Sequence, residues 1–198
     1  YQNVKSTLKN ILIKNNEDFL NDQFLNALKC ENYHIQILIH DLYDKYSDNE
    51  SLEEDEIHHL VNSFKTYCKE YLNNEKNKDL DNFKSYMNYF INNYEYFMNI
   101  IEKTFKNNKI IQKIFDKIFS DVLNNNIFNK DKHYTAECMA KYIDSLIKET
   151  IKNDSFLDNF EGCKNVFDVL KYVDDKDYFQ NYYKKYLMKR LLQNNYNI

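Results

Sequence analysis

The sequence predicts an all-α fold, and its composition carries most of that prediction. The 198 residues contain no proline and a single glycine, Gly162. Tight turns between strands depend on the backbone angles that these two residues supply, and both residues weaken helices. Hydrophobic residues make up 43% of the chain, which is enough for a core. We therefore expect an antiparallel bundle of helices whose short turns are closed by Asn and Asp.

Apolar residues spaced three and four apart predict the helices in chain order. The predicted segments are a first region up to about residue 30, then residues 32–46, 52–72, 79–105, 111–123, 135–147, 157–173 and 175–192. In the second of these, Ile35, Leu38 and Ile39 are expected on the buried face. In the last, residues four apart are expected to form the packed face, namely Phe179, Tyr183, Leu187 and Leu191.

Polar runs predict where these helices stop. Residues 47–50 should form a break and residues 73–78 a loop, while Asn107 and Asn108 interrupt the chain after the long helix. Ser51 and Glu54 have the spacing of a capping box, although a helix that continues through Ser51 is the alternative. Thr135 is a candidate N-cap, and residues 152–158 are expected to form a hinge.

Net charge and cysteine spacing exclude several classes of protein. The formal net charge is −4, whereas a nucleic-acid or anionic-membrane binder usually has a basic excess, so we expect neither partner. The four cysteines lie far apart and are expected to be reduced, partly buried thiols: Cys30, Cys68, Cys138 and Cys163. No signal peptide, transmembrane run or lipidation signal is visible. The sequence starts within a helical pattern and ends without a stop signal, so we expect it to be part of a longer protein.

Residue patterns for catalysis or metal binding are weak. The acidic run at residues 53–56 fits the first turn of a helix, where the helix dipole favours acids, better than a pair of catalytic carboxylates. Glu54 and His58 could begin a zinc site, but no other histidine has matching spacing, and an exposed ion pair is the stronger interpretation. One glycine cannot make a phosphate-binding loop. We expect no catalytic residue, no metal site and no cofactor.

The last predicted helix carries a basic cluster formed by Lys184, Lys185, Lys189 and Arg190. As a nucleic-acid site the cluster is short, and it lies in an acidic chain. As the exposed side of an amphipathic helix it is ordinary, because cations suit the last turns of a helix. A role in binding another protein stays open.

The C-terminal stretch contains an ordered series of motifs. An apolar helix end, Val166 to Val173, is followed by Lys176-Asp177-Tyr178-Phe179, a Tyr four residues after that Phe, and Leu187-Met188-Lys189-Arg190-Leu191. This series closely resembles the cullin family. The resemblance marks Lys176, Phe179, Tyr183, Leu187, Arg190 and Leu191 as signature residues, with Lys176 and Arg190 as polar anchors at the rim of the packed face. Met188 stands where the family usually has Ala, and Asn194-Asn195 also depart from its pattern.

Further segments resemble the same family. Residues 137–148, with Ala140, Tyr142, Asp144 and Leu146, are similar to the helix that closes the third cullin repeat. Residues 105–124 also resemble the family, and the similarity is weak before Leu52. The resemblance implies a cullin-repeat bundle at residues 31–152, the end of a preceding repeat or the repeat's own first helix at residues 1–30, and the first helices of the C-terminal domain at residues 157–198.

Cullins are scaffolds of ubiquitin ligases, so the resemblance implies a non-catalytic spacer that acts in ubiquitin-dependent protein catabolism. The partners it implies for the full-length protein are a RING-box protein, a substrate adaptor and a ubiquitin-like modifier, but the segments that bind them lie outside this chain. It also implies a location in the cytoplasm, the nucleus or both. The alternative is a helical-repeat interaction module unrelated to ubiquitin. The sequence leaves the oligomeric state open.

Overall fold

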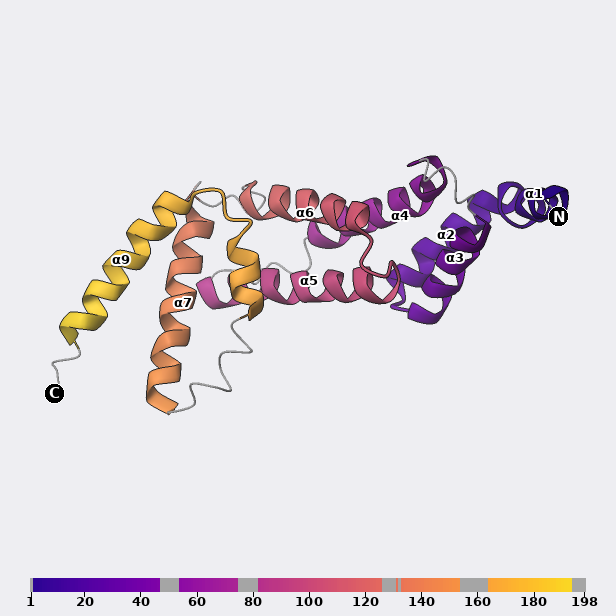
Figure 1. Ribbon diagram of the computed structural model, residues 1–198. Helices are drawn as coiled ribbons and strands as arrows, with labels where there is room; N and C mark the ends of the chain where they lie inside the picture. The colour runs from indigo at the N-terminus through magenta and orange to yellow at the C-terminus, as the bar shows by residue number, and fades with distance from the viewer. Residues whose placement is uncertain are drawn as a thin grey trace. The chain divides into compact units, whose positions relative to one another are not determined.

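The computed structural model confirms the all-α prediction (Figure 1). It describes residues 2–46, 54–74, 82–125, 131, 133–153 and 164–193, and within these ranges every regular element is helical. The elements are α1 (Gln2–Leu12), η1 (Lys14–Asn16), α2 (Glu17–Lys29), α3 (Tyr33–Tyr46), α4 (Glu54–Leu72), α5 (Phe83–Lys103), α6 (Lys109–Asn124), α7 (Tyr134–Asn153), a helical stretch at residues 164–170, and α9 (Lys176–Gln193).

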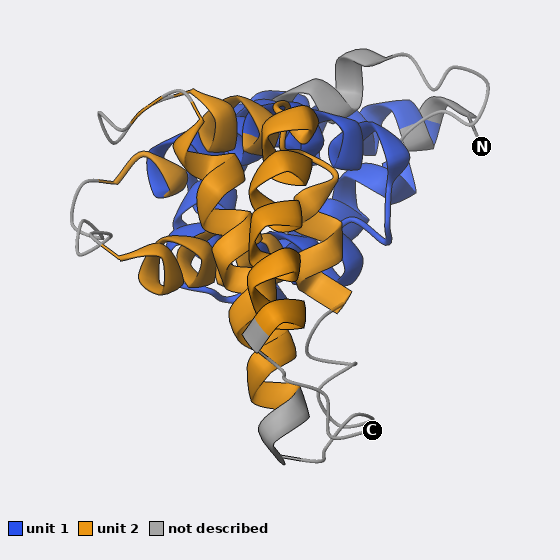
Figure 2. Cartoon of the chain, turned by 90° about the vertical axis from the view of Figure 1, so that its left-hand side faces the viewer, with its two compact units in different colours: residues 1–71, 97–118 blue, residues 72–96, 119–198 orange. Residues whose placement is uncertain are grey.

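The chain divides into two compact units (Figure 2). Unit 1 comprises residues 1–71 and 97–118, and unit 2 comprises residues 72–96 and 119–198. Helices α5 and α6 each contribute residues to both units.

Aromatic rings form the core of unit 1. Phe64 and Phe97 are fully buried, and Phe64 meets Phe105 edge to face with 5.2 Å between ring centroids. Phe24 adds a second edge contact to Phe105 at 5.9 Å. Edge-to-face pairs are worth roughly 0.5–1.5 kcal/mol each beyond the area they bury. The edge-to-face arrangement of the rings therefore stabilises this core in addition to the apolar area that they bury.

A buried chain of hydrogen bonds links α2, α3 and the turn that follows α5 in unit 1. Gln36 on α3 donates from Nε2 to the Ala27 carbonyl at 3.0 Å, and the Thr104 hydroxyl donates to Gln36 Oε1 at 2.7 Å. Both side chains are fully buried. Both polar ends of the Gln36 amide are paired, so this side chain can be buried without an unsatisfied hydrogen-bonding group. The face of α3 that carries Gln36 is therefore buried, and Leu38 is 55% exposed. The prediction that Leu38 lies on the buried face is therefore wrong.

The turn between α5 and α6 confirms the predicted interruption at Asn107 and Asn108. Lys106 and Asn107 have φ values of 51° and 58°, in the left-handed region that ends many helices. The Asn108 side chain then accepts the backbone N–H of Ile110 at 2.9 Å, which makes it the N-cap of α6.

His40 lies beside this turn, and its partly buried ring predicts that the stability of unit 1 depends on pH. Its ring meets Phe105 edge-on at 5.6 Å, and its Nδ1 is 3.6 Å from Asp41 Oδ1, too far for a hydrogen bond. Burial is the main cause that lowers the pKa of His40 below its ordinary value of about 6.5. The folded chain therefore takes up a proton at His40 less readily than the unfolded chain does.

We expect the free energy of unfolding to fall as the pH is lowered through about 6.5, because the unfolded state then binds more protons at this position. The loss should level off below the folded-state pKa. His40→Gln should remove part of this slope in urea unfolding series at pH 7 to 5. The exposed His34 provides the control, as His34→Gln should leave the slope in place. Equal slopes in both variants would contradict the assignment to His40.

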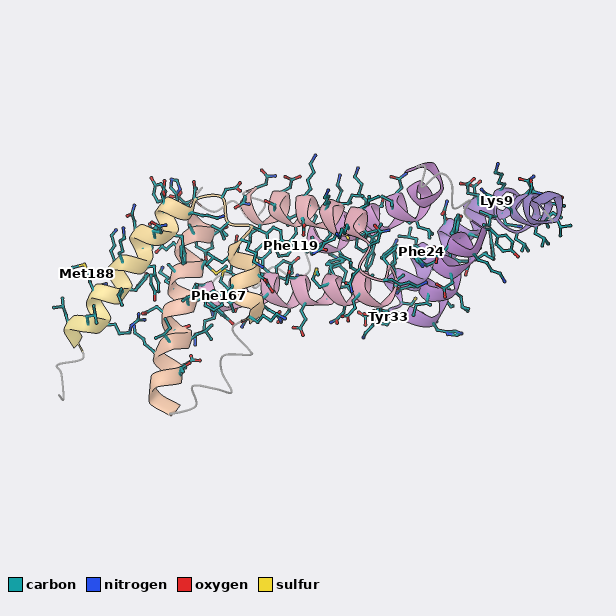
Figure 3. All side chains as sticks on the ribbon, viewed as in Figure 1. Lys9, Phe24, Tyr33, Phe119, Phe167 and Met188 are labelled. Atoms are coloured by element: carbon teal, nitrogen blue, oxygen red, sulfur yellow. The ribbon has the colours of Figure 1, made fainter. Side chains whose placement is uncertain are left out.

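Unit 2 has its own aromatic core. Phe90 on α5 meets Phe119 on α6 with 6.0 Å between centroids, and Phe119 meets Tyr172 at 5.2 Å. Phe90 and Phe119 are fully buried. Figure 3 labels Phe119 between the ribbons of α5 and α6. This core holds the segment that leads into α9 against α5 and α6.

Candidate functional site

The signature stretch at residues 166–192 begins with three valines that are buried in unit 2. Val166, Val169 and Val173 are each 2% exposed or less. Phe167, which the apolar pattern also placed on this helix, is 49% exposed. The predicted start of this helix at residues 157–163 and most of the predicted hinge lie outside the described residues, although residues 152 and 153 belong to α7.

Asn124, the last residue of α6, holds the turn before α9. Its Nδ2 donates to the Tyr172 carbonyl at 2.7 Å, and its Oδ1 accepts the backbone N–H of Asp174 at 3.1 Å. One amide side chain thus satisfies a backbone acceptor and a backbone donor on the two sides of Val173. This contact joins two segments that both resemble the cullin pattern.

Thr135 serves a different purpose from the one the sequence suggested. It is the second residue of α7, it is 9% exposed, and its hydroxyl donates to the Leu123 carbonyl at 3.0 Å. Tyr86 then donates its hydroxyl to Thr135 Oγ1 at 2.8 Å. Burial raises the pKa of Tyr86 to about 12. The N-cap prediction is wrong because the hydroxyl reaches across to α6 rather than back to its own helix.

The start of α7 also contacts the start of α9. His133 Nδ1 lies 2.8 Å from Asp175 Oδ2, and the His133 ring stacks on Tyr178 with 3.4 Å between centroids. Asp175 accepts the Phe179 N–H with its backbone carbonyl, as the residue before a helix does. The two contacts of His133 therefore fix the point where α9 begins.

Further along, α9 forms a ring stack within the helix and an ion pair with α7. Phe179 and Tyr183 stack with 6.0 Å between centroids, and the Arg190 guanidinium lies over the Tyr183 ring at 6.0 Å. Arg190 Nη1 donates to Asp144 Oδ1 on α7 at 2.6 Å, and the two side chains are only 11% and 6% exposed. Lys148 reaches the other Asp144 oxygen at 2.7 Å. A nearly buried carboxylate thus has a cation on each oxygen.

The repeat-closing residues lie on α7 in different environments. Ala140 is fully buried and Asp144 is 4% exposed, while Leu146 is half-buried. Tyr142 donates its hydroxyl to Asn88 Oδ1 on α5 at 2.6 Å. Within this set, Asp144 forms an ion pair with Arg190, a predicted residue of α9.

The signature residues of α9 do not share one face. Phe179, Tyr183 and Leu187 are half-buried, but Leu191 is 51% exposed. The prediction that Leu191 lies on the packed face is therefore wrong. An α-helix turns by about 100° per residue, so each step of four residues drifts by about 40°. After three steps Leu191 has moved about 120° away from Phe179. Arg190, eleven residues after Phe179, returns to the same side and meets α7, while Lys176 stays exposed.

The sequence did not predict two contacts that stabilise this site. Asn124 bonds to the turn before α9, and Thr135 bonds to α6. Each is a polar residue near a helix end, where local capping is the usual interpretation. Their actual partners lie 48 and 12 residues away along the chain. No local pattern signals such contacts.

Other candidate chemistry has little structural support. In the parts of the chain that the structure describes, no three His, Cys, Asp or Glu side chains gather as a metal site would require. The side chains of the acidic run and of His58 fall outside the described residues, as does Cys163. Cys68 and Cys138 are buried, and burial raises the pKa of the Cys68 thiol, while Cys30 is exposed. None of the described helices is both long and apolar enough to span a bilayer.

Comparison with known proteins gives the family. A family model described as the cullin alpha solenoid domain matches residues 1–197. Cullin-1 of Schizosaccharomyces pombe is 32% identical over 111 residues, which is 55% of this chain and 14% of that protein. Cullin-3 of Caenorhabditis elegans is 30% identical over 131 residues, which is 62% of this chain and 16% of that protein. The aligned part is thus a small share of either relative, but the family model spans nearly the whole of this chain, and the chain belongs to the cullin family.

Proposed function

We propose that this chain is a rigid, non-catalytic scaffold segment of a cullin-RING ubiquitin ligase. In that role it would keep the substrate-adaptor end of the full-length protein at a set distance from the RING-box end. The observation that carries the proposal is the cullin solenoid match over residues 1–197. The buried junction of α7 with α9 supports it, because a spacer needs continuous packing to stay stiff.

The proposal extends to domains and partners. Residues 31–152 would form the repeat proper, residues 1–30 would belong to its start or to the preceding repeat, and residues 157–198 would open the next domain. A RING-box protein, a substrate adaptor and a ubiquitin-like modifier would bind elsewhere on the full-length protein, with no nucleic acid or membrane involved. The complex would act in protein degradation in the cytoplasm, the nucleus or both, which imaging of a fluorescent fusion would test.

The test separates ligase membership from the spacing role. The full-length protein that carries this segment should co-purify with a recombinant RING-box protein, and failure to bind it would favour an interaction module unrelated to ubiquitin. A variant with residues 32–192 replaced by a flexible Gly-Ser linker should still bind partners at both ends but transfer ubiquitin to bound substrate more slowly. Unchanged transfer would contradict the spacing role alone.

A further inference from the structure

A small charged cluster lies in unit 1 where α3 meets the turn between α5 and α6. Its members are His40, Asp41, Asp44 and Lys106. Lys106 Nζ is 3.0 Å from Asp41 Oδ1 and 3.4 Å from Asp44 Oδ2. His40 Nδ1 is 3.6 Å from the same Asp41 oxygen. One carboxylate oxygen therefore lies within reach of two basic groups, of which Lys106 is the nearer.

The Nδ1 atom of His40 is buried, and no group in the described part of the chain forms a hydrogen bond with it. The ring is packed edge-on against Phe105, and Phe24 of α2 and Phe64 of α4 pack on that same ring without adding charge. A protonated imidazole carries an N–H at both nitrogens, and a buried N–H without an acceptor is costly. A small rotation of the Asp41 side chain would bring an acceptor within hydrogen-bonding distance of Nδ1.

In the described chain, the charged groups that act on His40 are Asp41 and Asp44 of its own helix and Lys106 of the turn. Burial has the largest effect and lowers the pKa of His40, the Asp41 carboxylate opposes this, and the Lys106 amine lowers that pKa further. The hydrogen bond from Lys106 holds the pKa of Asp41 below its ordinary value. Asp41 is therefore still ionised, and able to accept, at the pH at which His40 gains a proton.

We propose that protonation of His40 transfers Asp41 from Lys106 to the His40 ring, so that the charged cluster controls how firmly α3 holds the α5–α6 turn. The proton comes from solvent and binds at Nδ1, and Lys106 then retains Asp44 as its carboxylate partner. Lys106 and Asn107 have left-handed backbone angles, which are unfavourable in residues other than Gly and depend on surrounding contacts. The turn therefore opens more readily in acid. This device does not depend on the proposed ligase role.

An NMR titration of the 198-residue chain tests the transfer. The Asp41 carboxyl carbon should change its chemical shift with the same midpoint as the His40 ring, above the pH at which Asp41 itself is protonated. Lys106→Met should raise the His40 midpoint, because it removes a positive charge and leaves Asp41 to His40. Asp41→Asn should lower that midpoint. Both side chains are at least half exposed, so the helical circular dichroism should be unchanged.

The double variant Asp41→Asn/Lys106→Met distinguishes competition for Asp41 from simple charge repulsion. If Lys106 and His40 compete for this carboxylate, Lys106→Met should shift the His40 midpoint about twice as far or more when Asp41 is present as when it is Asn. Equal shifts in the two backgrounds would overturn the proposal, because Lys106 would then act on His40 through its charge alone.

Hydrogen exchange in the turn tests the consequence of the transfer. The backbone N–H groups of Asn107 and Asn108 donate to the carbonyls of Ile101 and Phe105. Their protection factors should fall about twofold or more as the pH is lowered through the His40 midpoint. The fall should disappear in His40→Gln and remain in the control variant His34→Gln. Protection that does not change with pH in the wild type, or that falls equally in both variants, would overturn the control of the turn by His40.

Discussion

Replacing Phe97 with alanine is expected to lower the free energy of unfolding by about 3–5 kcal/mol, the usual cost of removing a buried Phe side chain. Phe97 on α5 is fully buried in unit 1 and contacts several other aromatic rings. The centroid distances are 6.1 Å to Phe64, 5.9 Å to Tyr67, 5.5 Å to Tyr71 and 5.3 Å to Phe115. Its removal deletes these contacts and leaves a cavity that the stiff neighbouring rings cannot easily fill.

Urea unfolding followed by circular dichroism at 222 nm would measure the effect of Phe97→Ala. Phe19→Ala is the matched control, because Phe19 is 62% exposed and its truncation should change the free energy by no more than about 0.5 kcal/mol. Phe97→Leu should fall between the two, since it keeps part of the volume. A loss below about 1 kcal/mol in Phe97→Ala would show that the ring cluster is not a core of unit 1.

The helices themselves followed from composition and spacing. Without Pro and with one Gly, the chain has few ways to stop a helix except polar runs, and the break at Asn107 and Asn108 is where the structure turns. The Asn108 side chain accepts the backbone N–H of Ile110, two residues further along, as an N-cap does. Local signals of this kind are readable because both partners lie within a few residues.

Tertiary pairing explains what the sequence could not predict. The predicted buried face of α3 included Leu38, but Gln36 is buried instead and bonds to Thr104, 68 residues away along the chain. On α9, residues four apart suggested one stripe, but the drift of the helix brings Arg190 rather than Leu191 to α7. Which polar residue turns inward depends on a partner from another helix, and spacing along one helix does not reveal that partner.

Breaking the Asp144–Arg190 pair from the Asp144 side is expected to destabilise the chain by about 3–5 kcal/mol, because it leaves a nearly buried guanidinium without its carboxylate. Asp144→Leu is the variant to measure. Arg190→Met should cost less, since Lys148 still pairs with Asp144 from α7. Lys148→Ala, which removes a 47% exposed partner, should cost no more than about 1 kcal/mol.

The double variant Asp144→Leu/Arg190→Met decides what the pair contributes. An apolar pair of similar volume often restores or exceeds the stability of a buried ion pair, so the double variant should lie within about 1 kcal/mol of the wild type. The resulting coupling energy should reach about 2 kcal/mol or more in a urea-unfolding double-mutant cycle. Additive losses would mean that Arg190 and Asp144 contribute to stability independently of each other. A coupled result would show that this ion pair is a polar contact that helps to hold α9 on α7.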